Sequence, residues 1–193
     1  SLFEESLRIF RELNDKKSLA IVLFNAGKAL NSLGRNEKAL STFNESLKLS
    51  RELNNQQVIA GNLILIGNVY SSLGQYDKPL SYYQDALRIN RQLNNFQEIA
   101  LTLRNIGDAY CDLIEYDKAL KYYQEALDIQ KKQNLRFDMA ITLTNIGAFY
   151  KELNQYDKAL SYYERSLKIG RELDNSAMTA TNLNNIGNVY ANL

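Results

Sequence analysis

Acidic side chains recur along this sequence at a fixed spacing, and paired carboxylates can act as general acid and base. Asp77, Asp117 and Asp157 stand forty residues apart, each inside a stretch that reads YDKPL or YDKAL. The helix dipole favours a carboxylate near the start of a helix, which accounts for one acid per repeat without any reaction. The spacing therefore favours a structural role for these acids over paired-acid catalysis.

Other reactive side chains are sparse. The 193 residues include no histidine and a single cysteine, Cys111. Imidazole bases, histidine-activated nucleophiles and His-containing metal sites are therefore excluded. One thiol cannot form an internal disulfide or a thiolate zinc site, and no Gly-rich loop matches a phosphate-binding pattern. We expect no enzyme activity, with no catalytic residue, metal or cofactor.

Asparagine supplies the most informative pattern. The same position of four repeats holds Asn25, Asn105, Asn145 and Asn185. An asparagine amide offers both a donor and an acceptor, so such a ladder could bond the main chain of an extended peptide whatever its side chains. The alternative is that these asparagines are solvated, or bond adjacent helices, because polar residues must occupy any exposed face.

A forty-residue repeat determines which elements carry these residues. Alanine lies seven residues before a recurring glycine, leucine lies four before it, and tyrosine usually lies three after it, which is one face of a helix. A turn and a second apolar-periodic helix follow. We name the two helices of each repeat the A helix and the B helix. The recurring glycines are Gly27, Gly67, Gly107, Gly147 and Gly187.

The turn between the A helix and the B helix has a recognisable signature. Gly34, Gly74 and Asn154 suit the left-handed residue that ends a helix, whereas β-branched Ile114 does not. The sequence therefore predicts that the third turn differs from the others. Pro79 stands near the start of its B helix, where we expect it to be tolerated.

Each helical hairpin has only its neighbours to cover its apolar face, so stacking is required. All thirteen tyrosines fall in four columns of the repeat, which indicates packing. We predict an all-α solenoid of antiparallel helix–turn–helix units in a single array. Its expected parts are a B helix over 1–13, complete repeats over 16–53, 56–93, 96–133 and 136–173, and an A helix over 176–193.

These columns resemble the tetratricopeptide repeat. The family pattern of a large residue, glycine and tyrosine in the first helix, then small and aromatic residues in the second, matches Leu143, Gly147, Tyr150, Ala159 and Tyr163. Leucine replaces the first-helix tryptophan and the closing proline is absent, so the unit lengthens from about 34 residues to forty. This long form is similar to repeats of kinesin light chains, spindle-orientation adaptors, bacterial regulators and signalling ATPases. The resemblance implies a right-handed superhelix.

The resemblance also implies that one stripe of the A helices lines a concave wall where extended peptides lie. The stripe lies roughly opposite the apolar face and carries charges of both signs, so it implies neither a strongly acidic nor a strongly basic ligand. The family's clamp for a C-terminal carboxylate is not reproduced here. The candidate peptide-binding residues are Asn25, Lys28, Asn68, Arg104, Asn105, Asp108, Asn145, Lys151, Asn184, Asn185 and Asn188.

Composition narrows the function further. A net charge of +1, with 45% hydrophobic and 23% charged residues, favours a folded chain and gives no field for nucleic acid or a membrane. We expect a protein- or peptide-binding scaffold or sensor within a larger, cytoplasmic signalling protein. The alternatives are a purely structural or self-assembling segment and, less favoured by the charge, a helical-repeat RNA binder.

Both ends of the sequence fall inside a repeat. The pattern opens within a B helix and closes with an A helix. Apolar columns that internal repeats bury are therefore expected to be bare at the two ends, which predicts a part of a longer array that can self-associate head to tail. These residues are Leu2, Phe3, Leu7, Ile9, Phe10, Leu183, Ile186, Tyr190 and Leu193.

Overall fold

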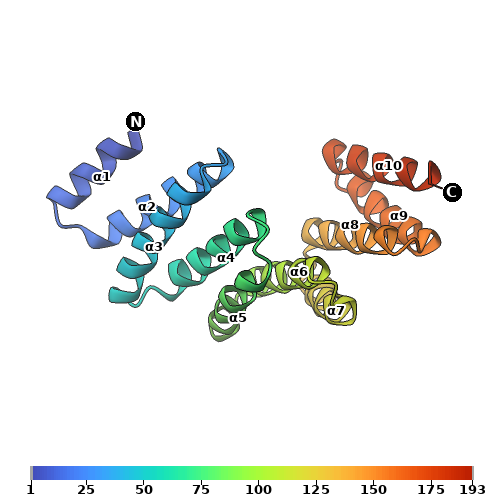
Figure 1. Ribbon diagram of the computed structural model, residues 1–193, viewed down its shortest axis with the longest axis horizontal. Coiled ribbons are helices and arrows are strands. Elements are labelled where there is room, and N and C mark those ends of the chain that lie inside the picture. Colours follow the sequence, from blue (N-terminus) through green and yellow to red (C-terminus); the bar gives the residue numbers. More distant parts are fainter. Residues whose placement is uncertain (1, 193) are drawn as a thin grey trace. The chain divides into compact units, whose positions relative to one another are not determined.

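The computed structural model describes residues 2–192, with the side chains of residues 5–192. Two compact units, 1–95 and 96–193, divide the chain, and each is described by itself (Figure 1). The first unit contains α1 (Leu2–Glu12), α2 (Lys16–Ser32), α3 (Asn36–Glu52), α4 (Gln56–Ser72) and α5 (Asp77–Gln92). The second contains α6 (Phe96–Asp112), α7 (Tyr116–Lys132), α8 (Arg136–Glu152), α9 (Tyr156–Glu172) and α10 (Ser176–Tyr190).

The predicted all-α repeat fold is confirmed. Over residues 2–192 the ten helices alternate between A helices (α2, α4, α6, α8, α10) and B helices (α1, α3, α5, α7, α9), without a strand. Each A helix from α2 to α8 packs against the B helix that follows it, and within each unit consecutive A helices also touch. The B helices run on to residues such as Lys132, which lengthens the repeat to forty residues.

Short connections between repeats share one conformation. Asn54 has a φ of 52°, and the next N–H, of Asn55, donates to the Ser50 carbonyl, which closes the end of α3. The Asn55 side chain then accepts from the Val58 N–H and caps α4. This pairing of a left-handed residue with an N-cap in three residues explains why neighbouring helices are antiparallel.

The expectation that the third turn differs is wrong. Ile114 has a φ of 62°, and its N–H donates to the Cys111 carbonyl at 2.9 Å, while the Glu115 N–H donates to the Tyr110 carbonyl at 2.9 Å. Gly74 makes the equivalent bond to Ser71 at 2.9 Å. The stacking of α6 on α7 imposes the turn, so Ile114 adopts a conformation that L-residues avoid.

Replacing Ile114 by glycine is therefore expected to stabilise the protein. The side chain is 71% exposed, so little burial is lost, and the left-handed conformation becomes unstrained. We expect a gain of about 1 kcal/mol, or a melting temperature roughly 2–4 °C higher by circular dichroism. Ile114→Asn, which copies Asn154, should act in the same direction, and Gly74→Ile should act in the opposite one. A lower melting temperature for both Ile114 variants would contradict this account.

Pro79 is tolerated, as predicted, with a small local change. It is buried in the first turn of α5, which begins at Asp77, whereas α7 and α9 begin at Tyr116 and Tyr156. In those sister helices the alanine at the proline position donates its N–H to a carbonyl four residues earlier. Proline lacks that donor, so α5 starts one residue later.

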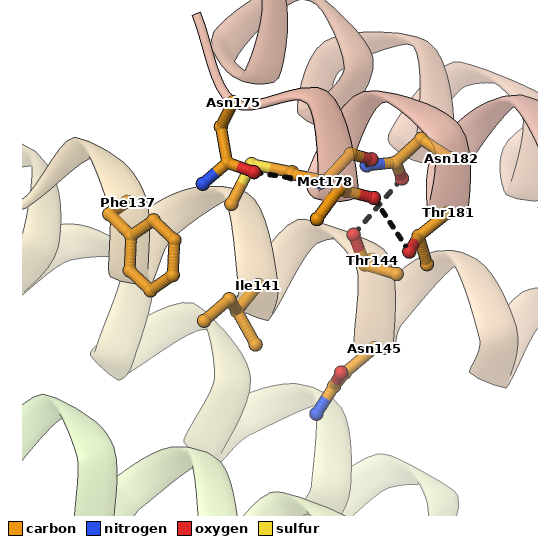
Figure 2. A pocket seen from close by; sticks show the side chains of 9 residues that line it. Phe137, Ile141, Thr144, Asn145, Asn175, Met178, Thr181 and Asn182 are labelled. Atoms are coloured by element: carbon orange, nitrogen blue, oxygen red, sulfur yellow. Dashed lines mark hydrogen bonds between the residues drawn. The ribbon is translucent and has the colours of Figure 1, made fainter. Parts of the chain in front are cut away.

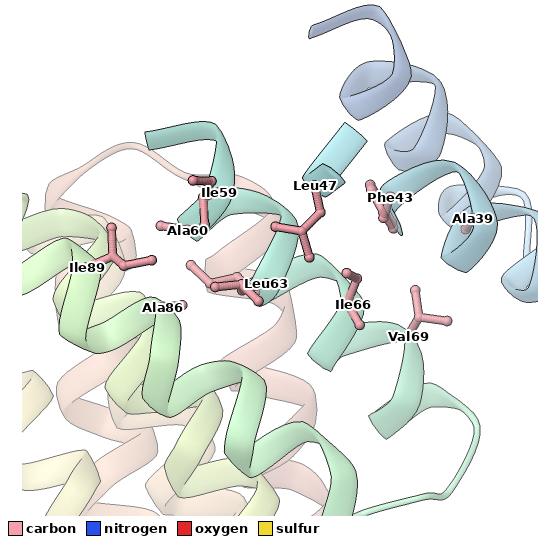
Figure 3. Packing of buried hydrophobic residues seen from close by; sticks show 11 residues of the cluster. Ala39, Phe43, Leu47, Ile59, Ala60, Leu63, Ile66, Val69, Ala86 and Ile89 are labelled. Atoms are coloured by element: carbon pink, nitrogen blue, oxygen red, sulfur yellow. The ribbon is translucent and has the colours of Figure 1, made fainter. Parts of the chain in front are cut away.

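The core of the first unit lies between α3, α4 and α5. Phe43 and Leu47 from α3 meet Leu63 and Ile66 from α4, and Ile89 of α5 packs on the other side (Figure 3). The recurring glycine permits this close approach. A methyl group added at Gly67 would lie 2.5 Å from the Tyr83 ring.

The second unit repeats this packing with tyrosine. Tyr123 and Tyr163 are buried against Gly107 and Gly147. Further tyrosines stack in pairs, with ring centroids 5.5 Å apart for Tyr110 and Tyr122. The interpretation of these tyrosine columns as packing is confirmed, whereas Tyr190 is 60% exposed.

Buried polar contacts join successive repeats. The Asn62 amide donates to Ser46 Oγ at 2.9 Å, and that hydroxyl donates to the Ala20 carbonyl at 2.8 Å. The second unit holds the same chain of bonds from Asn182 to Ser166 to Ala140. These bonds satisfy polar groups that are out of reach of water, so they hold the register between repeats.

Within residues 2–192, no helix combines the length and the apolar character needed to cross a membrane.

Candidate functional site

In the first unit some predicted binding residues are exposed to solvent, and one bonds the other helix of its own hairpin. Asn25 and Lys28 are exposed on α2, and the Lys28 ammonium lies 5.8 Å from the centre of the Phe24 ring. Asn68 on α4 is half-buried, and its Oδ1 accepts the Tyr83 hydroxyl at 2.8 Å. Asn68 therefore connects the two helices of its own repeat.

In the second unit the structure brings two predicted residues together. Asp108 Oδ1 accepts the Tyr123 hydroxyl at 2.5 Å and the Asn145 amide at 2.9 Å. These contacts join α6, α7 and α8 through one carboxylate. One end of the Asn145 amide thus bonds an adjacent helix, and its carbonyl oxygen is left for a further partner.

Burial is the main influence on the pKa of Asp108, and neighbouring groups oppose it. Burial raises the pKa of the Asp108 carboxyl, opposed by its hydrogen bonds to Tyr123 and Asn145 and by the positive charge of Arg104. Burial and the Asp108 charge likewise raise the pKa of Asp112. One nitrogen of Arg104, Nη1, is buried without a hydrogen-bond partner among the described residues.

The raised pKa of Asp108 predicts that the second unit loses stability as pH rises. A folded state whose carboxyl has the higher pKa binds more protons than the unfolded state, so stability falls from about pH 4 upward until that raised pKa is passed. Asp108→Asn should remove this dependence while keeping the acceptor, as Asn68 does for Tyr83. Urea unfolding of both proteins between pH 4 and 8 measures the difference. If the unfolding free energies of the two proteins changed with pH in parallel, Asp108 would have an ordinary pKa.

The other predicted residues lie on A helices of the second unit. Asn105 and Arg104 are half-buried on α6, and Lys151 is half-buried at the end of α8. On α10, Asn184 and Asn188 are exposed and Asn185 is half-buried. The α8 and α10 residues thus present amides and charge along neighbouring helices.

A pocket of about 300 Å³ lies between α8 and α10 (Figure 2). Its apolar wall consists of Phe137, Ile141, Ala177 and Met178. Its polar lining consists of Thr144, Asn145, Asn175, Thr181 and Asn182.

Hydrogen bonds hold the polar side of this pocket in place. The Asn182 carbonyl oxygen accepts the Thr144 hydroxyl at 3.0 Å, and Asn175 Oδ1 accepts the Met178 N–H at 2.9 Å as the cap of α10. Asn145 was expected from the sequence as a binding residue, but the rest of the lining was not. In Figure 2 the labelled apolar side chains face one another across the gap between the two helices.

The chemistry of these surfaces suits contact more than reaction. In the part of the chain that the structure describes, no three Asp, Glu or Cys side chains are placed to hold a metal ion. Burial raises the pKa of the Cys111 thiol to about 11, so this thiol is a poor nucleophile at neutral pH. Side-chain amides and small uncharged pockets are features through which proteins contact other polypeptides.

The stacked helical hairpins define a class of protein, a helical-repeat scaffold for protein–protein interaction. A family model described as tetratricopeptide repeat matches residues 1–52, 59–132 and 138–193. The chain therefore belongs to the tetratricopeptide repeat family. A search of curated proteins found no significant match.

Solved structures agree with this fold. BtubC from P. vanneervenii is similar with a TM-score of 0.82 and 23% identity, over 98% of this chain and 80% of that chain. A signal transduction ATPase with a tetratricopeptide repeat sensor, from Pyrococcus horikoshii, has a TM-score of 0.82 and 21% identity, over 99% and 30%. A Rap protein complexed with competence and sporulation factor has a TM-score of 0.69 and 17% identity, over 98% and 57%. The chain thus spans less than two thirds of the last two proteins.

Proposed function

We propose that this chain is a non-catalytic, cytoplasmic binding module of a larger signalling protein, and that it holds an extended peptide segment along its A helices. The observation that carries the proposal is the placement of Asn145 on α8 and Asn185 on α10, at the same position of two consecutive A helices. Donor and acceptor pairs at that spacing suit a peptide main chain. The complex of the similar Rap protein with competence and sporulation factor supports a binding role.

The contacts of the asparagines refine the proposal. Asn145 donates its amide nitrogen to Asp108, and the residue also lines the pocket between α8 and α10. Asn185 is half-buried. We therefore assign Asn145 the role of an acceptor for a ligand N–H, and Asn185 the role of donor and acceptor. The proposed surface of the second unit also includes Arg104, Asn105, Asp108, Lys151, Asn184 and Asn188. The proposed surface of the first unit consists of Asn25, Lys28 and Asn68.

Selection of random heptapeptides on the immobilised chain, followed by alanine substitution, tests the proposal. Asn185→Ala should weaken the selected peptides about fivefold, the value of roughly 1 kcal/mol for one hydrogen bond, with an unchanged melting temperature. Asn145→Ala should weaken them too and also lower stability, because the buried Asp108 carboxylate loses one of its two hydrogen-bond donors. Selection of no peptide would favour a purely structural segment. Lost stability without lost affinity would place both asparagines in the stack alone.

The outward face of α10 supports a second proposal, association with another repeat helix. Leu183 is 47% exposed, whereas the equivalent Leu63, Leu103 and Leu143 are at most 3% exposed. No atom lies within 4 Å of a methyl group added at Gly187. Ile186 was expected to be bare, but this is wrong, because it is partly buried against the cluster of Ala159, Tyr163 and Val189.

We propose that a B helix covers this face, and that α1 of a second copy can do so head to tail. Ile9 of α1 is 41% exposed, as expected. Leu7 and Phe10 were also expected to be bare, but this is wrong, because both are half-buried. Leu193 and the side chains of Leu2 and Phe3 lie outside the described residues. Sedimentation over a wide concentration range should show open-ended association that Leu183→Lys abolishes. A strict monomer at the highest concentration would contradict it.

A further inference from the structure

The pocket between α8 and α10 exists because one column of the repeat changes size. The position three residues before the recurring glycine holds Phe24 in α2, Arg104 in α6 and Thr144 in α8. In the first unit the ring of Phe24 reaches from α2 to α4, where a methyl group added at Gly61 would lie 3.0 Å from it. Gly61 occupies the position of Thr181.

In the second unit the short Thr144 leaves that space open. Its hydroxyl points to the polar side, where it bonds Asn182 and lies 2.9 Å from Ser166 Oγ. The wall that remains is apolar and comes from both helices, with Phe137 and Ile141 on α8 and Met178 on α10. Phe137 is 49% exposed, although burial of its ring would be favourable.

We propose, on the basis of the peptide binding proposed above, that this pocket selects one uncharged apolar side chain of the bound peptide, of the size of leucine or phenylalanine. None of the nine lining residues carries a charge, so a lysine or glutamate side chain would lose hydration without a partner. A cavity of about 150 Å³ is enough for benzene, and this pocket holds about 300 Å³.

The position of Asn145 connects the pocket to the peptide main chain. Asn145 lines the pocket and lies at the ladder position of α8. A peptide main chain that bonds Asn145 would therefore run beside the pocket wall formed by Ile141 and Met178. The asparagines then supply affinity that is independent of sequence, and the pocket supplies the selectivity that the ladder lacks.

Methyl NMR of the 193-residue chain tests the inference with defined probes. The probes are capped pentapeptides with alanine at four positions and alanine, leucine, phenylalanine, lysine or glutamate at the centre. Leucine and phenylalanine probes should shift the methyl signals of Ile141 and Met178 at millimolar concentration, and the other three should not. Phe137→Ala should weaken the phenylalanine probe at least about tenfold. Phe96→Ala, which removes another exposed ring of the same unit outside the pocket, should leave it unchanged.

A variant that fills the pocket distinguishes loss of the pocket from loss of the fold. Thr181→Leu should abolish the response without unfolding the protein, because Ile21, Leu101 and Ile141 occupy the same column. Equal responses to all five probes, with shifts of the Asn145 and Asn185 side-chain amides, would overturn the pocket and keep the peptide proposal. Preference for lysine or glutamate would also overturn it. No shift of any of these signals with any probe would overturn both.

Discussion

Replacing Gly147 by alanine is expected to destabilise the protein, whereas the same change at Gly187 is expected to stabilise it slightly. A methyl group at Gly147 would lie 2.6 Å from the ring of Tyr163, which is 1% exposed and has no room to move. Overpacking of this kind costs about 1–3 kcal/mol, or roughly 2–12 °C in melting temperature. At Gly187 nothing lies within 4 Å, so only the higher helix propensity of alanine remains, worth about 0.5–1 kcal/mol.

Thermal melts of both variants and of Gly147→Ala with Tyr163→Leu check this expectation. The double variant should recover part of the loss, since the smaller side chain gives the methyl group room. Gly107→Ala should reproduce the result through Tyr123, because the same contact is 2.7 Å there. Equal effects at Gly147 and Gly187 would show that helix propensity alone governs this column.

Replacing Ser166 by alanine is expected to cost about 1–3 kcal/mol, the range for a buried amide that loses one hydrogen-bond partner, since the Asn182 amide nitrogen keeps only the Met178 carbonyl. The Asn182 amide donates to Ser166 Oγ, and both residues are at most 1% exposed. The chain itself contains the compensating change, because Ala126 stands at the position of Ser166 where Thr142 stands at the position of Asn182.

A double-mutant cycle on Ser166 and Asn182 measures this coupling. Ser166→Ala with Asn182→Thr should be more stable than the sum of the single changes predicts, by about 1 kcal/mol or more, because the threonine hydroxyl can bond its own helix as Thr142 does with the Asp138 carbonyl. Ser46 and Asn62 provide a replicate in the first unit. Strict additivity would show that the hydrogen bond contributes nothing to stability.

The helices and their order were predictable because the forty-residue period is strong and uninterrupted. Equivalent positions of the repeats have the same packing environment. The packing role of Gly67 or Tyr83 could therefore be inferred from the recurrence of the same residue type at the same position. The conformation at Ile114 was not predictable from local preference, because contacts between α6 and α7 override it.

The candidate site was less predictable than the fold. The ladder position followed from helical periodicity, but periodicity cannot show that Asn145 donates to Asp108, since that bond joins residues in different repeats. The sequence analysis did not predict the pocket, because the pocket depends on the small size of the Thr144 side chain. The sequence did contain a sign of the pocket, because the small Thr144 stands at the repeat position that holds Phe24 and Arg104 in other repeats.

Because of its environment, the single thiol of this chain, Cys111, can be used to measure the separation of α6 from α7. Its sulfur lies 3.5 Å from the Tyr123 hydroxyl, and the high pKa of about 11 keeps it protonated at neutral pH. Cys111 is half-buried, so an alkylating reagent should react slowly with the folded hairpin and faster when α6 separates from α7. Under conditions where closing is faster than alkylation, the labelling rate reads the free energy of that opening. A partner that clamps the second unit would slow the labelling by the factor with which it favours the closed hairpin.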